Sequence, residues 1–142
     1  MRKNSGFTIT ELMVTIAVIA ILASLAIPNF IAWLPNYRLR SGAEEIQSTL
    51  QFARITAIKR NATTTVAFDI ANETYRASVV GGEAIRGGRM PAGIDINSAF
   101  GGTSVQFDSR GIASAAGTAV VRNNLGRERK IAVYITGNSR ID

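Results

Sequence analysis

The acidic residue that stands out in this sequence is Glu11, because it is the only charged side chain in an apolar run from Phe7 to Ile27. As a helix, this run would be ~31 Å long, which is enough to cross the hydrocarbon core of a bilayer. An unpaired charge inside a membrane costs roughly 2.5–3.5 kcal/mol or more. We therefore expect the Glu11 carboxylate to have a specific partner.

The other residue types do not form a catalytic or metal-binding arrangement. The chain has no histidine and no cysteine, which removes the commonest general base and the commonest zinc ligands. Its acidic residues are scattered, and no serine or threonine lies in a nucleophile motif. The glycine pairs at 81–82, 87–88 and 101–102 lack a phosphate-binding spacing and predict turns. We expect no enzymatic activity, no cofactor and no bound metal.

The residues around Glu11 form a specific pattern. A short basic leader at residues 1–6 precedes the stretch Gly6–Leu12, which reads GFTITEL. This stretch resembles the processing site of type IV pilin-like proteins, the class III signal sequence. The resemblance implies that a prepilin peptidase cleaves between Gly6 and Phe7 and that Phe7, the new amino terminus, becomes N-methylated. It also identifies Pro28 with the helix-kinking proline of that family.

The resemblance gives Glu11 a partner. In this family the carboxylate is thought to pair with the N-terminal amine of a neighbouring subunit, so that its charge is buried only when a fibre forms. Two other interpretations are an ordinary secretory signal with a small-residue cleavage site at Ser24–Ala26 and a plain transmembrane anchor. Glu11 argues against the secretory signal and is left unexplained by the plain anchor. We therefore adopt the pilin-like interpretation.

A second helical pattern follows the apolar run, over Ser41–Ala62. Apolar residues recur there at three- and four-residue steps, at Ala43, Ile46, Leu50, Ala53, Ala57 and Ile58. This is the period of a helix that is buried on one face. We expect this segment to be the soluble half of one long N-terminal helix that ends at Asn61. Arg54, Lys59 and Arg60 are expected to form a solvated helix end.

The rest of the chain predicts short strands that are separated by glycine turns. The expected strands cover residues 63–68, 75–80, 93–97, 104–107, 118–122, 130–136 and 139–141. Short strands of this kind favour antiparallel sheets, against which a helix packs its apolar face. The predicted fold class is α+β, with a long N-terminal helix (a transmembrane half plus an amphipathic half) packed on small antiparallel β-sheets.

Three segments of the soluble part resemble the GspH/FimT family of minor pseudopilins and pilins. Leu50–Asn61 is similar to a helical segment of that family, and Val105–Gly111 is similar to a later segment with a phenylalanine and a glycine. Ile131–Ile141 is similar to the strand–turn–strand that closes the family's fold. The resemblance covers nearly the whole chain and implies a long helix followed by two small antiparallel sheets.

The resemblance implies a structural role. The protein would be a minor pilin or pseudopilin of a type II secretion or type IV pilus machine, priming or capping fibre assembly and contacting other minor subunits. Residues 1–6 would be the leader peptide, 7–37 the transmembrane and assembly helix, and 38–142 a periplasmic pilin-like domain.

The same resemblance implies the partners and the location. Expected partners are other pilins through the N-terminal helix, the prepilin peptidase, the inner-membrane assembly platform and the lipid bilayer. The chain would cross the bacterial inner membrane once, with its C-terminal domain in the periplasm, before incorporation into a periplasmic or surface fibre.

The main alternative is a DNA-binding tip pilin for DNA uptake, because the C-terminal part of this chain of net charge +6 is basic. The candidate DNA contacts are Arg127, Arg129, Lys130 and Arg140. Some FimT-type pilins bind DNA through a Gly-Arg-x-Arg motif. Gly126–Arg129 matches those letters but precedes the closing strand, whereas Gly137–Arg140, at the family's position, lacks the first arginine. Glu128 also offsets the charge, and a few arginines give a weak, salt-sensitive affinity, so the structural role is favoured.

Overall fold

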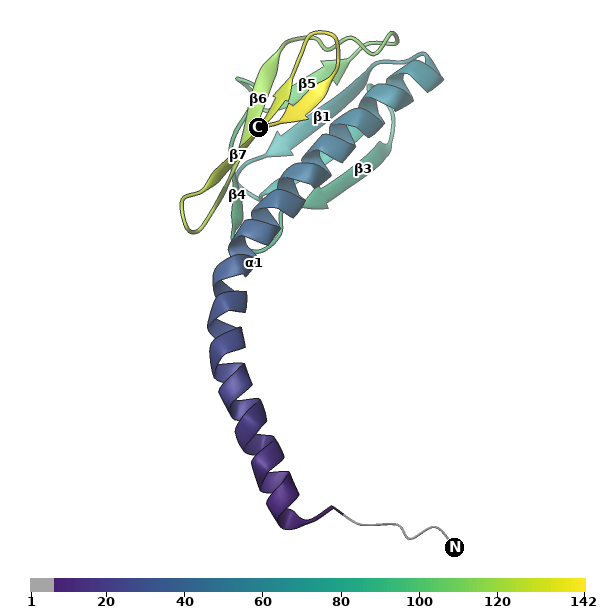
Figure 1. Cartoon of the computed structure of the whole chain (residues 1–142). Helices are drawn as coiled ribbons and strands as arrows, with labels where there is room; N and C mark the ends of the chain where they lie inside the picture. Colours follow the sequence, from purple (N-terminus) through teal and green to yellow (C-terminus); the bar gives the residue numbers. More distant parts are fainter. Residues whose placement is uncertain (1–6) are drawn as a thin grey trace, which may run out of the picture. The chain divides into compact units, whose positions relative to one another are not determined.

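The computed structural model describes residues 7–142, which form one long helix followed by eight strands (Figure 1). The helix, α1, runs from Ile9 to Arg60. The strands are β1 Thr64–Asp69, β2 Thr74–Val79, β3 Ala84–Arg89, β4 Ile94–Ala99, β5 Ser104–Phe107, β6 Gly117–Asn123, β7 Glu128–Val133 and β8 Ser139–Ile141. This element order confirms the predicted α+β class.

Contacts between residues divide the chain into two compact units, with the boundary between Leu34 and Pro35. The first unit contains the first half of α1. The second unit, Pro35–Asp142, contains the second half of α1 and all eight strands.

The strands form two antiparallel sheets of four strands each. The first sheet has the order β3-β2-β1-β5, and the second has the order β4-β6-β7-β8. All the pairings between neighbouring strands are antiparallel. The two small antiparallel sheets expected from the family resemblance are therefore confirmed.

The second half of α1 packs one face into a core that includes both sheets. The buried residues of that face are Leu39, Gly42, Ala43, Ile46, Thr49, Leu50, Ala53, Thr56 and Ala57. They recur at three- and four-residue steps, as the sequence pattern predicts. Ile58 is the exception, because its side chain is 48% exposed and does not belong to the buried face.

The end of α1 is fixed by a left-handed residue. Asn61 has a φ of 45°, its N–H donates to the carbonyl of Ile58, and the N–H of Ala62 donates to the carbonyl of Ala57. This pair of bonds is a Schellman motif, which satisfies carbonyls that the last turn of a helix leaves without partners. The expected helix end at Asn61 is confirmed.

Arg54 does not belong to a solvated helix end. The side chain is half-buried, and its Nε donates to the carbonyl of Gly111 at 3.0 Å. Its Nη1 donates to Oδ1 of Asn138 at 2.7 Å. Arg54 therefore joins α1 to two loops of the strand region, whereas Lys59 and Arg60 are exposed as expected.

A polar contact also joins the two sheets. Glu73 lies in the turn between β1 and β2, and its carboxyl group lies close to that of Asp95 on β4. The Asp95 carboxyl raises the pKa of Glu73 above its usual value, because two carboxyl groups close together favour a proton shared between them.

Strand β3 lies where the glycine pair at 87–88 predicts a turn, so this prediction is wrong. These glycines lie inside the strand, where Gly88 pairs with Tyr75 of β2. A Cβ atom at Gly88 would lie 2.5 Å from the Tyr75 hydroxyl oxygen and 2.9 Å from Cζ of that ring. The tyrosine ring therefore occupies the space that a side chain at position 88 would need. A glycine here is required by packing across the strands and not by a turn.

Gly88→Ala is expected to destabilise the domain by about 1–3 kcal/mol, because the new methyl group overlaps the buried Tyr75 ring. The matched control is Gly102→Ala, since no atom lies within 4 Å of a Cβ built there. Thermal unfolding of the full-length protein in detergent, followed by circular dichroism, measures the difference. Equal unfolding temperatures for the two variants would contradict the packing explanation.

Candidate functional site

The first half of α1 presents apolar side chains without cover from the chain itself. From Phe7 to Trp33, every residue is exposed except Ala23, which is half-buried. The most apolar 18-residue window of the helix has a mean hydropathy of 2.3, so the helix is long and apolar enough to cross a membrane. Because exposing this much apolar surface to water is unfavourable, the segment requires a bilayer or other apolar helices around it.

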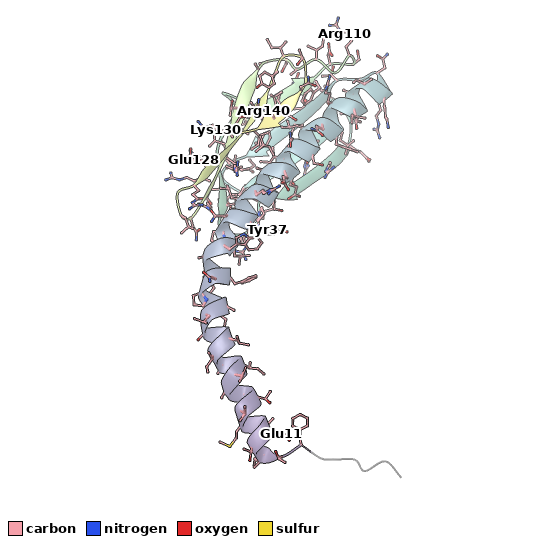
Figure 2. The ribbon with its side chains drawn as sticks, viewed as in Figure 1. Glu11, Tyr37, Arg110, Glu128, Lys130 and Arg140 are labelled. Carbon is pink, nitrogen blue, oxygen red and sulfur yellow. The ribbon has the colours of Figure 1, made fainter. Side chains whose placement is uncertain are left out.

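Glu11 lies in the first turn of α1 (Figure 2). It exchanges hydrogen bonds with Thr8. The backbone N–H of Thr8 donates to Glu11 Oε2 at 3.0 Å, and the backbone N–H of Glu11 donates to Thr8 Oγ1 at 3.2 Å. The Thr8 hydroxyl also donates to Glu11 Oε2 at 3.0 Å. This reciprocal arrangement is a capping box, with Thr8 as the N-cap residue.

The capping box gives the Glu11 carboxylate a partner inside its own chain. It satisfies backbone donors at the start of the helix and places a negative charge near the positive end of the helix dipole. The partner expected for Glu11 is therefore in part Thr8, and the Thr-x-x-Glu spacing before an apolar run is the usual sequence signal for this cap. Pairing of Glu11 with the amine of a neighbouring subunit stays a prediction.

The two other N-terminal predictions concern processing and a kink. Gly6 lies outside the described residues, and Phe7 on the other side of the expected cleavage site is 83% exposed. Pro28 lies within α1, where its ring removes the N–H that would otherwise bond to the carbonyl of Ser24. Cleavage between Gly6 and Phe7, methylation of Phe7 and a kink at Pro28 stay predictions.

The basic residues proposed as DNA contacts do not share one face of the second sheet. Ile131 is buried in the core, and side chains alternate along a strand, so Arg129 lies on the face toward the core and Lys130 on the opposite face. Arg129 lines a recess of about 240 Å³ beside α1. Arg140 on β8 pairs in register with Ala132, which places it on the same face as Lys130.

Carboxylates accompany the basic side chains at this sheet. Nε of Arg140 lies 3.1 Å from Oδ1 of Asp142, and Nε of Arg122 lies 4.0 Å from Oε1 of Glu128. Figure 2 shows Glu128, Lys130 and Arg140 on the side of β7 and β8. Exposed ion pairs of this kind stabilise a fold little, but each reduces the positive potential available to a phosphate.

Arg110 is a basic residue of another loop, and Figure 2 shows it away from Lys130 and Arg140. Its Nη2 donates to Oδ2 of Asp108 at 3.1 Å. The backbone N–H of Ile112, followed by the contacts from Arg110, keeps the pKa of Asp108 below its usual value. This carboxylate is therefore ionised at neutral pH and offsets the charge of Arg110.

Comparison with known families decides the assignment. Residues 42–138 match the family described as type II transport protein GspH, and residues 1–27 match the prokaryotic N-terminal methylation motif. The chain belongs to the GspH family. The expected relationship to pilin-like proteins is thereby confirmed for both parts of this GspH-family protein.

One curated relative is the type IV major pilin protein PilA of Myxococcus xanthus. It is 34% identical to the GspH-family chain over 124 residues, which are 86% of this chain and 50% of PilA. The chain therefore spans half the length of that relative.

Two solved structures show the same fold. The type IV minor pilin FimU of Pseudomonas aeruginosa gives a TM-score of 0.65 at 17% identity, covering 75% of this GspH-family chain and 90% of FimU. The minor pseudopilin EpsH of the Vibrio cholerae type 2 secretion system gives a TM-score of 0.61 at 11% identity, covering 74% and 96%. At these identities the likeness shows the fold alone.

The candidate DNA contacts lie on two faces of the second sheet and are accompanied by carboxylates. We therefore predict no measurable binding of duplex DNA by the full-length protein in detergent at near-physiological salt. A gel-shift titration over a range of salt concentrations tests this. Phosphate contacts would give a slope of about −0.9 per contact in a plot of log affinity against log salt. Tight binding that is lost in the Arg127→Ala/Arg129→Ala double variant, but kept in Lys59→Ala, would contradict the prediction.

Proposed function

We propose that this protein is a structural minor subunit of a type IV pilus or type II secretion fibre and has no enzymatic activity. The observation that supports this most directly is the exposed apolar surface of α1 from Phe7 to Trp33. The same helix continues into a domain whose core covers its second half. The first half of the helix therefore needs apolar surroundings, whereas the second half is part of the domain's own core.

We infer that residues 7–37 anchor the protein in the bacterial inner membrane by a single pass and that residues 38–142 lie in the periplasm. The leader, residues 1–6, is removed by the prepilin peptidase. An assembly platform in the membrane then transfers the mature chain into a fibre. In the fibre, the apolar helices of other pilins replace the lipid around the first half of α1, so the same surface serves both environments.

Glu11 is proposed to have successive partners. In the membrane, its carboxylate caps its own helix through Thr8, which limits the cost of the charge. In the fibre, the positively charged amine of a neighbouring Phe7 pairs with the same carboxylate. This pairing favours a fixed stagger between subunits, because a charge buried among apolar helices is tolerated only where its partner is present.

The role in assembly is proposed to be priming or capping of the fibre near its tip, in contact with other minor subunits. FimU and EpsH are a minor pilin and a minor pseudopilin, and their fold is the one found here. A minor pilin and a minor pseudopilin thus share this fold, so a pilus and a secretion fibre are both compatible with it. DNA capture is not favoured, because the basic residues are divided between two faces and accompanied by carboxylates.

Processing predicts that the mature protein begins at N-methylated Phe7. Intact-mass and peptide mass spectrometry of protein isolated from the membrane should find this terminus, and a strain without prepilin peptidase should retain residues 1–6. A mature chain that begins at Ile27 would instead indicate cleavage as an ordinary secretory signal and would overturn the proposal.

Two substitutions at Glu11 separate the cap from the charge. Glu11→Ala removes both, whereas Glu11→Gln removes the charge and keeps an acceptor that can complete the capping box. We expect both variants to insert in the membrane at least as well as the natural protein, because the span becomes less polar. We also expect both to lose incorporation into fibres, measured by immunoblotting of sheared or extracted fibres.

Thr8→Val is the matched control, because it removes the capping hydroxyl, at a cost of about 1 kcal/mol, and leaves the carboxylate in place. It should assemble better than Glu11→Gln. If Glu11→Gln assembled normally while Glu11→Ala failed, the cap and not the charge would be the assembly requirement.

A further inference from the structure

Strand β3 forms one edge of the first sheet, and its outer side is open. It is the terminal strand in the order β3-β2-β1-β5 and pairs with β2 alone. Four of its six residues are exposed, and the other two, Ile85 and Gly88, are half-buried. In Figure 1 this strand lies at the margin of the sheet beside the second half of α1.

The backbone of β3 has hydrogen-bonding groups that face away from β2. The N–H of Met90, directly after the strand, donates to the carbonyl of Glu73 at 2.9 Å. In an antiparallel pair, bonded and non-bonded positions alternate, so Gly88 and Arg86 also face β2. The N–H and carbonyl groups of Gly87 and Arg89 therefore point to the open side. Such an edge is a template for an added strand.

A groove with apolar walls lies beside the start of β3. Its volume is about 430 Å³, and it is lined by Phe52, Ile55, Thr56, Lys59, Arg60, Glu83, Ala84 and Ile85. Phe52 and Ile55 on α1 are 40% and 49% exposed, so this face of the helix has apolar side chains that the domain does not cover. An apolar side chain of an added strand would fit between α1 and the edge.

The charges around this edge are mostly positive and are not paired. Arg86 lies over the Phe52 ring, with Cζ 5.6 Å from the ring centroid, and Lys59 and Arg60 line the groove. Within residues 7–142, no ion pair joins these three cations or Arg89 to a carboxylate. The neighbouring acidic groups are Glu83 at the groove, Glu45 beside Gly88 and Glu73 near Arg89. By contrast, Arg122 and Arg140 of the second sheet have carboxylate partners.

We propose that the open edge of β3 and the adjoining groove bind an extended acidic segment of a partner protein, which adds to the sheet as a further strand. Its backbone pairs with Gly87 and Arg89, apolar side chains on its core-side face enter the groove beside Phe52 and Ile55, and carboxylates on its opposite face meet Arg89. Lys59, Arg60 and Arg86 at the groove add to the positive potential that attracts the segment. The positive rim selects acidic partners, and the strand pairing selects extended ones. This interaction does not depend on the role of the apolar half of α1.

The test uses the full-length protein in neutral detergent and a fluorescent eight-residue peptide in which Glu and Val alternate, with blocked ends. Binding is measured by fluorescence anisotropy at low salt and again at physiological salt. We expect saturable binding that weakens as salt rises. We expect at least tenfold weaker binding for a Lys–Val peptide, which reverses the charge, and for a Glu–Pro peptide, which keeps the charge but cannot form a strand.

Two variants at one position separate the backbone from the charge. Arg89→Gln removes the charge, whereas Arg89→Pro also removes the N–H on the open side and leaves the bonds to β2 in place. We expect affinity for the Glu–Val peptide to fall about twofold in Arg89→Gln and at least tenfold in Arg89→Pro. Thermal unfolding of both variants verifies that the domain remains folded. The Glu–Pro peptide tests the need for strand pairing on the natural protein, without any substitution.

A second pair of variants tests the rim. Lys59→Gln/Arg60→Gln should weaken binding about fivefold, whereas Arg127→Gln/Arg129→Gln, at the other sheet, should leave it unchanged. Absence of binding by the Glu–Val peptide would overturn the proposal. Equal binding of the Glu–Val and Glu–Pro peptides would also overturn it, because charge alone would then explain the affinity. An equal loss in the two double variants would show that the site is not at this edge.

Discussion

The fold depends on the packing of one face of α1 against two sheets at once. Small residues, among them Ala43, Ala53 and Ala57, are fully buried on that face, so the helix approaches the strands closely. Larger side chains such as Ile46 and Leu50 fill the core between them. The buried residues of the helix and of both sheets belong to a single apolar core. Without the helix, each sheet would therefore expose part of its apolar face to water.

This packing explains how one helix serves two environments. In the second half of α1, the core covers the apolar side chains of one face. The Schellman motif at Asn61 ends the helix where the core ends. In its first half the chain supplies no such cover, and the Thr8–Glu11 cap satisfies the backbone at the start of the helix. The two halves of α1 therefore differ in what surrounds them, and these surroundings, more than helix propensity, stabilise each half.

The sequence predicted those features that a short-range pattern determines. The helix followed from apolar periodicity. Seven of the eight strands followed from short runs separated by glycines, of which the first two are alternating and β-branched. Strand β3 could not be predicted in this way, because the reason for Gly88 is the ring of Tyr75 on the neighbouring strand. The opposite facing of Arg129 and Lys130 likewise required the observed bounds of β7, because the predicted strand began at residue 130 and did not include Arg129. The Thr8–Glu11 cap is different, since its signal, Thr-x-x-Glu before an apolar run, is present in the sequence itself.

The uncovered apolar surface of α1 also limits how the protein can leave a fibre of the proposed kind. Release into water would expose that surface, and each fully exposed side chain of the size of leucine or isoleucine adds about 1.5–3 kcal/mol to the cost. Return to a bilayer adds no comparable cost, because lipid tails are as apolar as the neighbouring helices. Disassembly would therefore be vectorial, directed into the membrane at the base of the fibre. The membrane would then act as a reservoir from which the same subunits are used again.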